Sequence, residues 1–306
     1  MPVIDVQNLV VDYGKGRKTH RALHGISFQV QPGECVGFIG ANGAGKSTTM
    51  KSLLGFVFPT SGSARVFGEA AGTVASRRRL GYLPEVALYY PFMKARELLE
   101  LYGGLQGLSR RDLKTRIPGL LAEVGLEGKG EQLLKNFSKG MQQRLGIAQA
   151  IIADPELLIF DELSSGLDPM GRHDLREVLL NLKRKGTTIF FSSHELSEVE
   201  ALCDRVIIIN RGQVITQAPV SELMQPLNRF RIVFQCQGSP SADVEALRPV
   251  REGDSYSLDL TSQADYASAI AALTRNGCNI NHTESQVQSL EDYFIGLVKG
   301  APEPVG

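Results

Sequence analysis

The chain has 306 residues, 42% hydrophobic and 22% charged, a composition typical of a folded protein of about two domains rather than a disordered one. Its 33 lysine and arginine residues balance 33 aspartate and glutamate residues, so no net charge favours nucleic acid as a partner. No apolar run approaches the roughly 20 residues of a membrane-spanning helix, and the N-terminus lacks a signal-peptide pattern, so we expect a soluble, cytoplasmic chain.

Short β-like runs separated by turn signals fill residues 1–70. One of them, ECVGFI, leads into GANGAGKSTT, and a predicted helix follows. Gly40, Gly45, Lys46 and Ser47 fit the pattern GxxxxGK[ST], in which backbone N–H groups wrap phosphates, the lysine reaches the outer phosphates and the hydroxyl binds Mg²⁺. A plain turn is the alternative interpretation. The strand before the loop and the helix after it favour a phosphate-binding loop.

Helical patterns dominate from about residue 92 to 153, with SRRD at 109–112 as a candidate helix cap and Pro118 as an expected kink or break. Strand and helix then alternate through ELLIF, TTIFFSS and RVIIIN. This alternation predicts a parallel α/β sheet interrupted by a helical insertion.

A change in composition just past Pro219 marks a predicted domain boundary. We expect a first domain over residues 1–220 and a small α+β domain over 221–300, built from runs such as RFRIVFQC and SYSLDL. No catalytic pattern falls in the second domain, so we expect it to regulate or to support dimerisation. Residues 301–306 are predicted to form a flexible tail.

The run ELLIFDEL places two acidic residues directly after an apolar strand. Asp161 there can hold the water shell of Mg²⁺ beside a phosphate loop, and Glu162 can orient or deprotonate the attacking water. The alternative is a helix cap or a solvated strand end. His194 ends a further apolar strand, where it is a candidate to contact the γ-phosphate or to steady the water, although a lone histidine is more often structural.

A second phosphate-binding surface is predicted at NFSKGMQQRLGIAQAIIADP. Ser138 stands at the expected N-cap of a helix, so its hydroxyl, Gly140 and the positive helix end face one direction. One chain cannot easily aim this surface and the phosphate loop at the same nucleotide. We therefore expect two chains to pair head to tail around two ATP molecules.

The four cysteines, Cys35, Cys203, Cys236 and Cys278, are widely separated and form no CxxC pair. Their spacing argues against a metal site and against a disulfide framework. We expect reduced and mostly buried thiols.

These motifs, in this order, resemble those of the ATP-binding subunits of ABC transporters, and the resemblance covers about residues 3–220. DYG contains an aromatic similar to the one that stacks on adenine, GYLPE stands at the Q-loop, FSKGM at the signature, FDE after the apolar strand, SGLD at the D-loop and FFSSH at the switch histidine. The nucleotide-binding residues that this resemblance implies are Tyr13, Asn42, Gly43, Gly45, Lys46, Ser47, Thr48, Glu85, Ser138, Gly140 and Asp168.

The resemblance implies a P-loop NTPase fold with a β-rich N-terminal part and a helical subdomain at about 87–153. It implies ATP and Mg²⁺ as cofactors, and ATP hydrolysis that powers transport. Its expected partners are transmembrane permease subunits and a second copy of the chain or a related ATPase, without nucleic acid. Such a subunit would lie in the cytoplasm, on the inner face of the membrane. The implied catalytic residues are Glu162, His194 and Lys46, and the implied metal ligands are Ser47, Asp161 and Glu85.

Two departures from the family pattern matter. The signature reads FSKGM rather than LSGGQ, and Glu85 stands where glutamine is usual. Glu85 could face the metal or the permease, and we favour the permease. Both variants, together with the C-terminal domain, resemble the branch of the family that partners drug, lipid, polysaccharide or metal-factor exporters.

Two alternative functions fit the sequence less well. A soluble ABC protein that remodels nucleic acid or ribosomes is disfavoured, because the chain has neither a long coiled coil nor two ATPase units. A degenerate, regulatory ATP binder is disfavoured because Lys46, Glu162 and His194 are all present.

Overall fold

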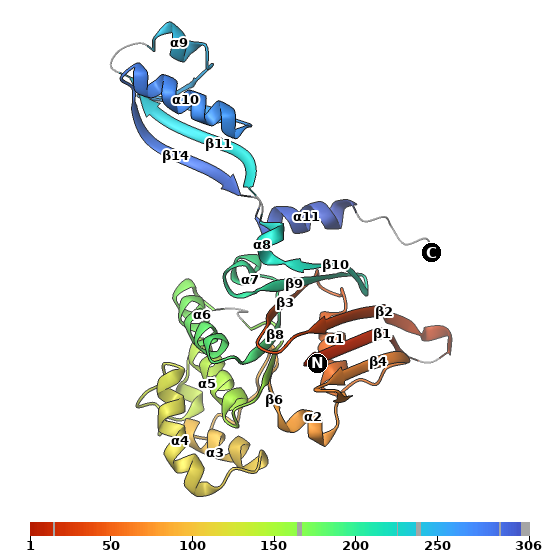
Figure 1. Ribbon diagram of the computed structural model, residues 1–306. Coiled ribbons are helices and arrows are strands. Elements are labelled where there is room, and N and C mark those ends of the chain that lie inside the picture. The colour runs from red at the N-terminus through yellow and green to blue at the C-terminus, as the bar shows by residue number, and fades with distance from the viewer. Residues whose placement is uncertain (15, 164–166, 225, 237–239, 288, 301–306) are drawn as a thin grey trace. The chain divides into compact units, whose positions relative to one another are not determined.

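The computed structural model describes residues 1–14, 16–163, 167–224, 226–236, 240–287 and 289–300 (Figure 1). The chain divides into two compact units, Met1–Val220 and Ser221–Gly306. Each unit has its own sheet structure and its own hydrophobic core. The predicted α/β fold with a β-rich N-terminal part is confirmed in the first unit, and the second unit combines an antiparallel sheet with helices.

A four-stranded antiparallel sheet, ordered β2-β1-β4-β5, opens the first unit. Its strands are β1 (Ile4–Tyr13), β2 (His20–Val30), β4 (Ser61–Val66) and β5 (Glu69–Ala70), and a 3₁₀ turn, η1 (Gly16–Lys18), lies between β1 and β2. Val6 and Leu9 are both buried, so the alternation of β1 skips a residue near Asn8, which has φ 47°. The β1–β2 register shifts at the same place, and this bulge keeps the apolar face of β1 toward the core.

The second sheet has the strand order β10-β9-β3-β8-β7-β6. It consists of β3 (Cys35–Ile39), β6 (Leu80–Leu83), β7 (Leu157–Phe160), β8 (Thr188–Ser193), β9 (Arg205–Asn210) and β10 (Gln213–Pro219). All neighbours pair in parallel except β9 and β10. Every residue of β3, β7 and β8 is buried, as expected for strands covered on both faces. The carboxyl ends of these three adjacent strands therefore meet at one edge of the sheet.

Aromatic side chains join the two sheets of the first unit. Phe28 of β2, Phe38 of β3 and Phe190 of β8 are almost completely buried, with ring centroids 5.3 to 5.7 Å apart. Such ring pairs contribute about 0.5–1.5 kcal/mol each beyond the area they bury. Met50 of α1 (Lys46–Leu53) belongs to the same core, so the helix after the phosphate loop is anchored to the sheets.

The helical insertion consists of α3 (Ala95–Leu105), α4 (Arg110–Glu123), η2 (Leu134–Asn136) and α5 (Lys139–Ile151), which lie together in Figure 1. Ser109 caps α4 as predicted, accepting a hydrogen bond from Asp112 N at 3.2 Å. The prediction that Pro118 divides this helix is wrong, because α4 is one helix that continues past the proline. Ile117 and Leu121, on either side of the proline in sequence, are buried, and their packing outweighs the lost backbone bond.

The remaining helices of the first unit are α2 (Val74–Arg78), α6 (Pro169–Arg184) and α7 (Leu196–Leu202), and α8 (Val220–Leu223) stands at the boundary of the units. Four apolar residues of α6 face the interior at helical spacing: Leu175, Val178, Leu179 and Leu182. This stripe fixes the start of α6, and with it Asp168, beside the sheet.

The second unit is built on a four-stranded antiparallel sheet ordered β12-β13-β11-β14. Its elements are β11 (Pro226–Gln235), α9 (Ala242–Glu245), β12 (Val250–Glu252), β13 (Ser255–Leu260), α10 (Gln263–Arg275), β14 (Asn279–Val287) and α11 (Leu290–Gly300). Ile232, Phe234, Leu258 and Leu273 are among the buried residues of its core. The predicted tail at 301–306 lies outside the described residues.

The prediction that all four cysteines are reduced thiols is wrong for two of them. Gln235 pairs with Asn279 across β11 and β14, and this register brings Cys236 beside Cys278, with which it forms a disulfide. The two cysteines are 42 residues apart in the sequence, so their spacing did not reveal the pair. Cys35 and Cys203 are buried free thiols, and burial raises the pKa of the Cys203 thiol above its ordinary value.

Candidate active site

The glycine-rich loop joins β3 to α1 at the carboxyl edge of the parallel sheet. A Cβ atom at Gly40 would lie 2.4 Å from the carbonyl oxygen of Ile209, and one at Gly45 would lie 2.7 Å from a methyl carbon of Leu23. Gly45 also has φ 110°, a conformation that favours glycine. These two positions therefore need glycine for the loop to close against β9 and β2.

Lys46 is the first residue of α1 and is only 6% exposed. Its Nζ atom donates a hydrogen bond to Gly40 O at 2.7 Å and lies 3.4 Å from both Ala41 O and Glu162 Oε1. The ammonium group is thus held inside the loop by carbonyl oxygens and one carboxylate. A buried cation held in this way can transfer its bonds to phosphate oxygens without leaving the site.

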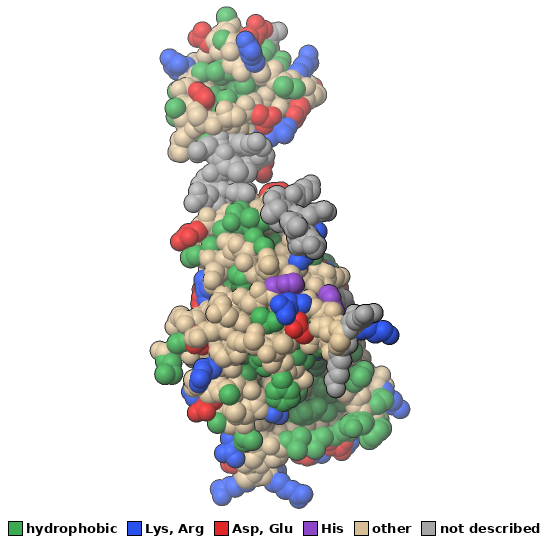
Figure 2. Space-filling model, turned by 90° about the vertical axis from the view of Figure 1, so that its right-hand side faces the viewer, with side chains coloured by type: hydrophobic (Ala, Val, Ile, Leu, Met, Phe, Trp, Pro, Cys, Tyr) green, Lys and Arg blue, Asp and Glu red, His purple; other side chains and the backbone are tan. Residues whose placement is uncertain are grey.

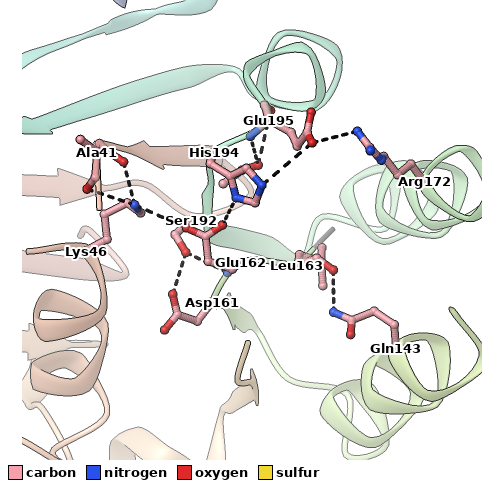
Figure 3. A network of polar contacts seen from close by, with 12 residues as sticks. Ala41, Lys46, Gln143, Asp161, Glu162, Leu163, Arg172, Ser192, His194 and Glu195 are labelled. Carbon is pink, nitrogen blue, oxygen red and sulfur yellow. Dashed lines mark hydrogen bonds and ion pairs between the residues drawn. The ribbon is translucent and has the colours of Figure 1, made fainter. Parts of the chain in front are cut away.

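Asp161 and Glu162 follow β7, and Ser192 of the neighbouring strand β8 contacts both of them (Figure 3). The Ser192 hydroxyl donates to Asp161 Oδ1 at 2.8 Å and accepts from Glu162 N at 2.9 Å. Glu162 has φ 52°, which is unusual for a residue with a side chain. The two carboxylates, predicted as a pair from the sequence, are therefore held by a third residue that the sequence did not single out.

His194 follows β8 and lies beside Glu162 at the carboxyl edge of the parallel sheet. Its Nδ1 atom is within hydrogen-bond reach of Glu162 Oε2, and the imidazole is 53% exposed. Glu195 Oε1 lies 4.0 Å from His194 Nε2 and 3.0 Å from a guanidinium nitrogen of Arg172. Figure 3 shows the resulting row of polar groups from Lys46 through Glu162 and His194 to Arg172.

A cavity of about 520 Å³ lies over the glycine-rich loop. Tyr13 stands at its rim, 40% exposed, with its hydroxyl 3.4 Å from Thr48 Oγ1. The structure thus brings together, from segments far apart in the sequence, most of the residues predicted to bind the nucleotide. The lining residues are Tyr13, His20, Ala22, Ala41, Asn42, Gly43, Gly45, Lys46, Ser47, Thr48, Glu85, Glu162 and His194.

Three of the predicted nucleotide-binding residues, Ser138, Gly140 and Asp168, are not among the lining residues of this cavity. Ser138 caps α5, accepting from Met141 N at 3.2 Å, and Asp168 caps α6, accepting from Gly171 N at 2.8 Å. A Cβ atom at Gly140 would lie 3.7 Å from a methyl carbon of Leu167, so the signature and the D-loop are neighbours within the chain. The serine and glycine that precede Leu167 in the SGLD motif lie outside the described residues.

Gln143 and Arg172 are polar residues that sequence reasoning missed. Gln143 of α5 is buried and donates to Leu163 O at 2.6 Å, directly after the Asp161–Glu162 pair. Arg172 of α6 donates to Leu167 O at 3.1 Å besides its contact with Glu195. The contacts with Leu163 and Glu195 join segments that are distant in sequence, so no local signal announces them.

All three predicted metal ligands, Ser47, Asp161 and Glu85, would coordinate through oxygen atoms. Ser47 and Glu85 line the cavity, whereas Asp161 is buried, is not among its lining residues and is bonded to Ser192. Among the described residues, no group of three His, Cys, Asp or Glu side chains is placed to hold a metal by itself. A hydroxyl and a carboxylate without a full protein cage fit Mg²⁺, which prefers few protein oxygens together with phosphate oxygens and water.

Comparisons with known proteins agree on one family. A sequence model described as ABC transporter matches residues 23–165. An uncharacterised ABC transporter ATP-binding protein of Nostoc sp. is 40% identical, over 91% of this chain and 83% of that protein. The Nod factor export ATP-binding protein I of Ralstonia nicotianae is 36% identical, over 73% of this chain and 69% of that protein.

A solved structure of an ATP-binding subunit of an ABC transporter superimposes with a TM-score of 0.65 and 34% identity, over 72% of this chain and 91% of that one. The fold, the glycine-rich loop and the acidic pair at its edge agree with this kinship. The chain therefore belongs to the ABC transporter ATP-binding proteins, and it is an ATPase of that family.

Proposed function

We propose that this chain dimerises around two ATP molecules and powers export through separate transmembrane permease subunits. One observation supports the proposed dimer: Lys46, Glu162 and His194 line the cavity, but Ser138 and Gly140 do not. A second chain related by a two-fold axis would bring its own Ser138 and helix N-terminus to this cavity. In this arrangement each ATP is bound by the phosphate loop of one chain and the signature of the other.

In the proposed complex, Lys46 and the loop N–H groups bind the β- and γ-phosphates, with Asn42, Gly43 and Thr48 at the same cavity. Tyr13 stacks on the adenine ring, a contact of about 1–3 kcal/mol in other base–aromatic pairs. Ser47 and Asp161 would hold Mg²⁺, which when bound neutralises charge on the phosphates. Glu85 lines the same cavity and stands next to the surface proposed below for the permease.

Glu162 is proposed to orient and deprotonate the attacking water, and His194 to contact the γ-phosphate. Both side chains line the cavity and lie within hydrogen-bond reach of each other. The contact between them keeps the carboxylate and the imidazole on the side of the phosphate loop. A carboxylate so placed can take a proton from water as the water attacks.

An exposed apolar segment, residues 86–92, is the proposed contact for the permease. Val86, Leu88, Tyr90 and Phe92 are 60% to 88% exposed. Tyr89 between them is partly buried, donates to Gln149 Oε1 at 3.1 Å and has a pKa raised by burial. An anchored residue with exposed apolar residues on both sides is typical of a surface that another protein covers.

Figure 2 shows hydrophobic side chains gathered beside a hollow on one face of the larger unit, Met1–Val220.

Of the helices in the described part of the chain, none has the length and hydropathy of a membrane span. Export as the direction is supported by the Ralstonia relative, whose name assigns it to Nod factor export.

Leu88→Asp tests the permease contact. The variant should hydrolyse ATP like the wild type as an isolated chain, because Leu88 is 88% exposed and is not among the residues that line the cavity. Burying a leucine contributes about 1.5–3 kcal/mol, so binding to the permease should weaken at least about tenfold. The measurement is cosedimentation of the purified chain with inside-out vesicles that carry its permease.

Leu105→Asp is the matched control, because Leu105 is 74% exposed at the end of α3 and outside segment 86–92. It should bind the vesicles normally. Equal binding by Leu88→Asp and the wild type would remove this segment from the proposed interface.

A further inference from the structure

We propose that Ser192 is a positioning residue that orients Asp161 and Glu162 together through its one hydroxyl group; this inference rests on the proposed roles of those two carboxylates. Ser192 is completely buried, and its hydroxyl lies between Asp161 Oδ1 at 2.8 Å and Glu162 N at 2.9 Å. It is not among the described residues that line the cavity. Its effect on ATP hydrolysis must therefore act through its two partners.

The direction of both bonds follows from donor chemistry. A serine hydroxyl has one hydrogen to donate and lone pairs that accept. The backbone N–H of Glu162 can only donate, so the hydroxyl accepts there and its single hydrogen is directed to Asp161 Oδ1. That bond engages Oδ1 alone and leaves Oδ2 free of Ser192. The carboxylate is thereby held in one orientation for the water shell of the metal.

The bond to Glu162 acts on the backbone. Glu162 has φ 52°, in the left-handed region that residues with a side chain rarely adopt. At this turn the chain leaves β7, and the side chain reaches His194 Nδ1 and approaches Lys46 Nζ at 3.4 Å. The Ser192 oxygen gives the Glu162 N–H a partner in this conformation, so it stabilises the turn that aims the carboxylate.

Ser192 has no exposed surface, so its hydroxyl is out of contact with bulk solvent. The neighbouring Ser193 bonds elsewhere, since its hydroxyl accepts from Glu195 N at 2.9 Å and donates its hydrogen to Glu195 O at 3.3 Å. Loss of the Ser192 hydroxyl alone would leave Asp161 Oδ1 and Glu162 N without this partner. Partners that orient metal-binding groups typically change metal affinity or activity by about 10–100-fold when removed.

The test compares Ser192→Ala with Thr188→Ala. Thr188 is a buried hydroxyl residue at the other end of the same strand, where its oxygen accepts from Gly33 N at 2.9 Å. The probe is a fluorescent ADP, titrated with and without Mg²⁺, together with ATP turnover and thermal unfolding. Ser192→Ala should bind the probe without Mg²⁺ within about twofold of wild type, since the loop and Lys46 are unchanged.

The gain in affinity that Mg²⁺ adds should fall about tenfold in Ser192→Ala, and turnover should fall about 10–100-fold. Thr188→Ala should unfold at a lower temperature but keep both the Mg²⁺ gain and the turnover. Ser192→Thr, which retains the hydroxyl, should restore most of both. Where Ser192→Ala does not fold, Ser192→Cys replaces it with the same expectations, because the thiol keeps the size and weakens both bonds.

A wild-type Mg²⁺ gain and turnover in Ser192→Ala would overturn the inference. So would equal losses with and without Mg²⁺ that track thermal unfolding, as a merely structural role requires. Glu162→Gln, measured alongside, separates two failures. If it retains turnover, the catalytic role proposed for Glu162 is wrong; if it is inactive while Ser192→Ala is normal, only the role of Ser192 is wrong.

Discussion

Glu162→Gln should lower ATP turnover by at least about 100-fold, because general-base catalysis contributes about 10²–10⁴-fold and an amide cannot take the proton. ATP binding should persist. Ser47 and the glycine-rich loop keep their contacts. Lys46 loses the carboxylate charge at 3.4 Å but keeps its hydrogen bond to Gly40 O, and the glutamine keeps the size of the side chain. The measurements are phosphate release at saturating Mg·ATP and titration with a fluorescent ATP.

Glu156→Gln is the control for the loss of a carboxylate near β7. Glu156 precedes the same strand at its opposite end and pairs with Arg79, and its side chain is 58% exposed. Exposed ion pairs contribute about 0–1 kcal/mol, so turnover should stay normal. Near wild-type turnover in Glu162→Gln would remove Glu162 from the catalytic role.

Lys46→Ala should weaken ATP binding itself rather than the chemical step alone. The Lys46 ammonium group is buried in the loop, and hydrogen bonds to charged groups contribute about 1.5–3 kcal/mol, so affinity should fall roughly 10- to 150-fold. Lys51→Ala is the matched control, because Lys51 is exposed on the same helix α1. Fluorescent ATP titrations compare the two variants, and an unchanged affinity in Lys46→Ala would contradict a phosphate-binding role for the loop.

Local signals predicted the parts of the site that lie within one segment. The strand before Gly40 and the helix from Lys46 are recognisable because glycine spacing, β-branched residues and the helix pattern are all contiguous. The apolar strands that end before Asp161 and His194 were also recognisable. Because ligands bind beyond the carboxyl ends of parallel strands, the residues after both strands could be assigned to one site from the sequence.

Contacts between distant segments could not be predicted in this way. Ser192 and Asp161 are 31 residues apart, Gln143 and Leu163 are 20 apart, and the two disulfide cysteines are 42 apart. Each pair depends on strand order, register or helix packing, which composition and periodicity do not specify for a sheet of mixed connection lengths. Serine and glutamine also occur so often on surfaces that neither residue type suggested a buried role.

The second unit illustrates the same limit for function. Its strands and its long helix follow from alternation and helical spacing, as in β13 (Ser255–Leu260) and α10 (Gln263–Arg275). We retain the proposal that this unit regulates the ATPase or supports the dimer.

Sedimentation velocity of Glu162→Gln, with and without Ser138→Arg, tests the shared ATP site most directly. With Mg·ATP, Glu162→Gln should sediment as a dimer. The double variant should remain a monomer that still binds ATP, because Ser138 is exposed and is not among the lining residues of its own chain's cavity. A dimer in both proteins, a monomer in both, or loss of ATP binding on adding Ser138→Arg to a folded chain would contradict a site built from two chains.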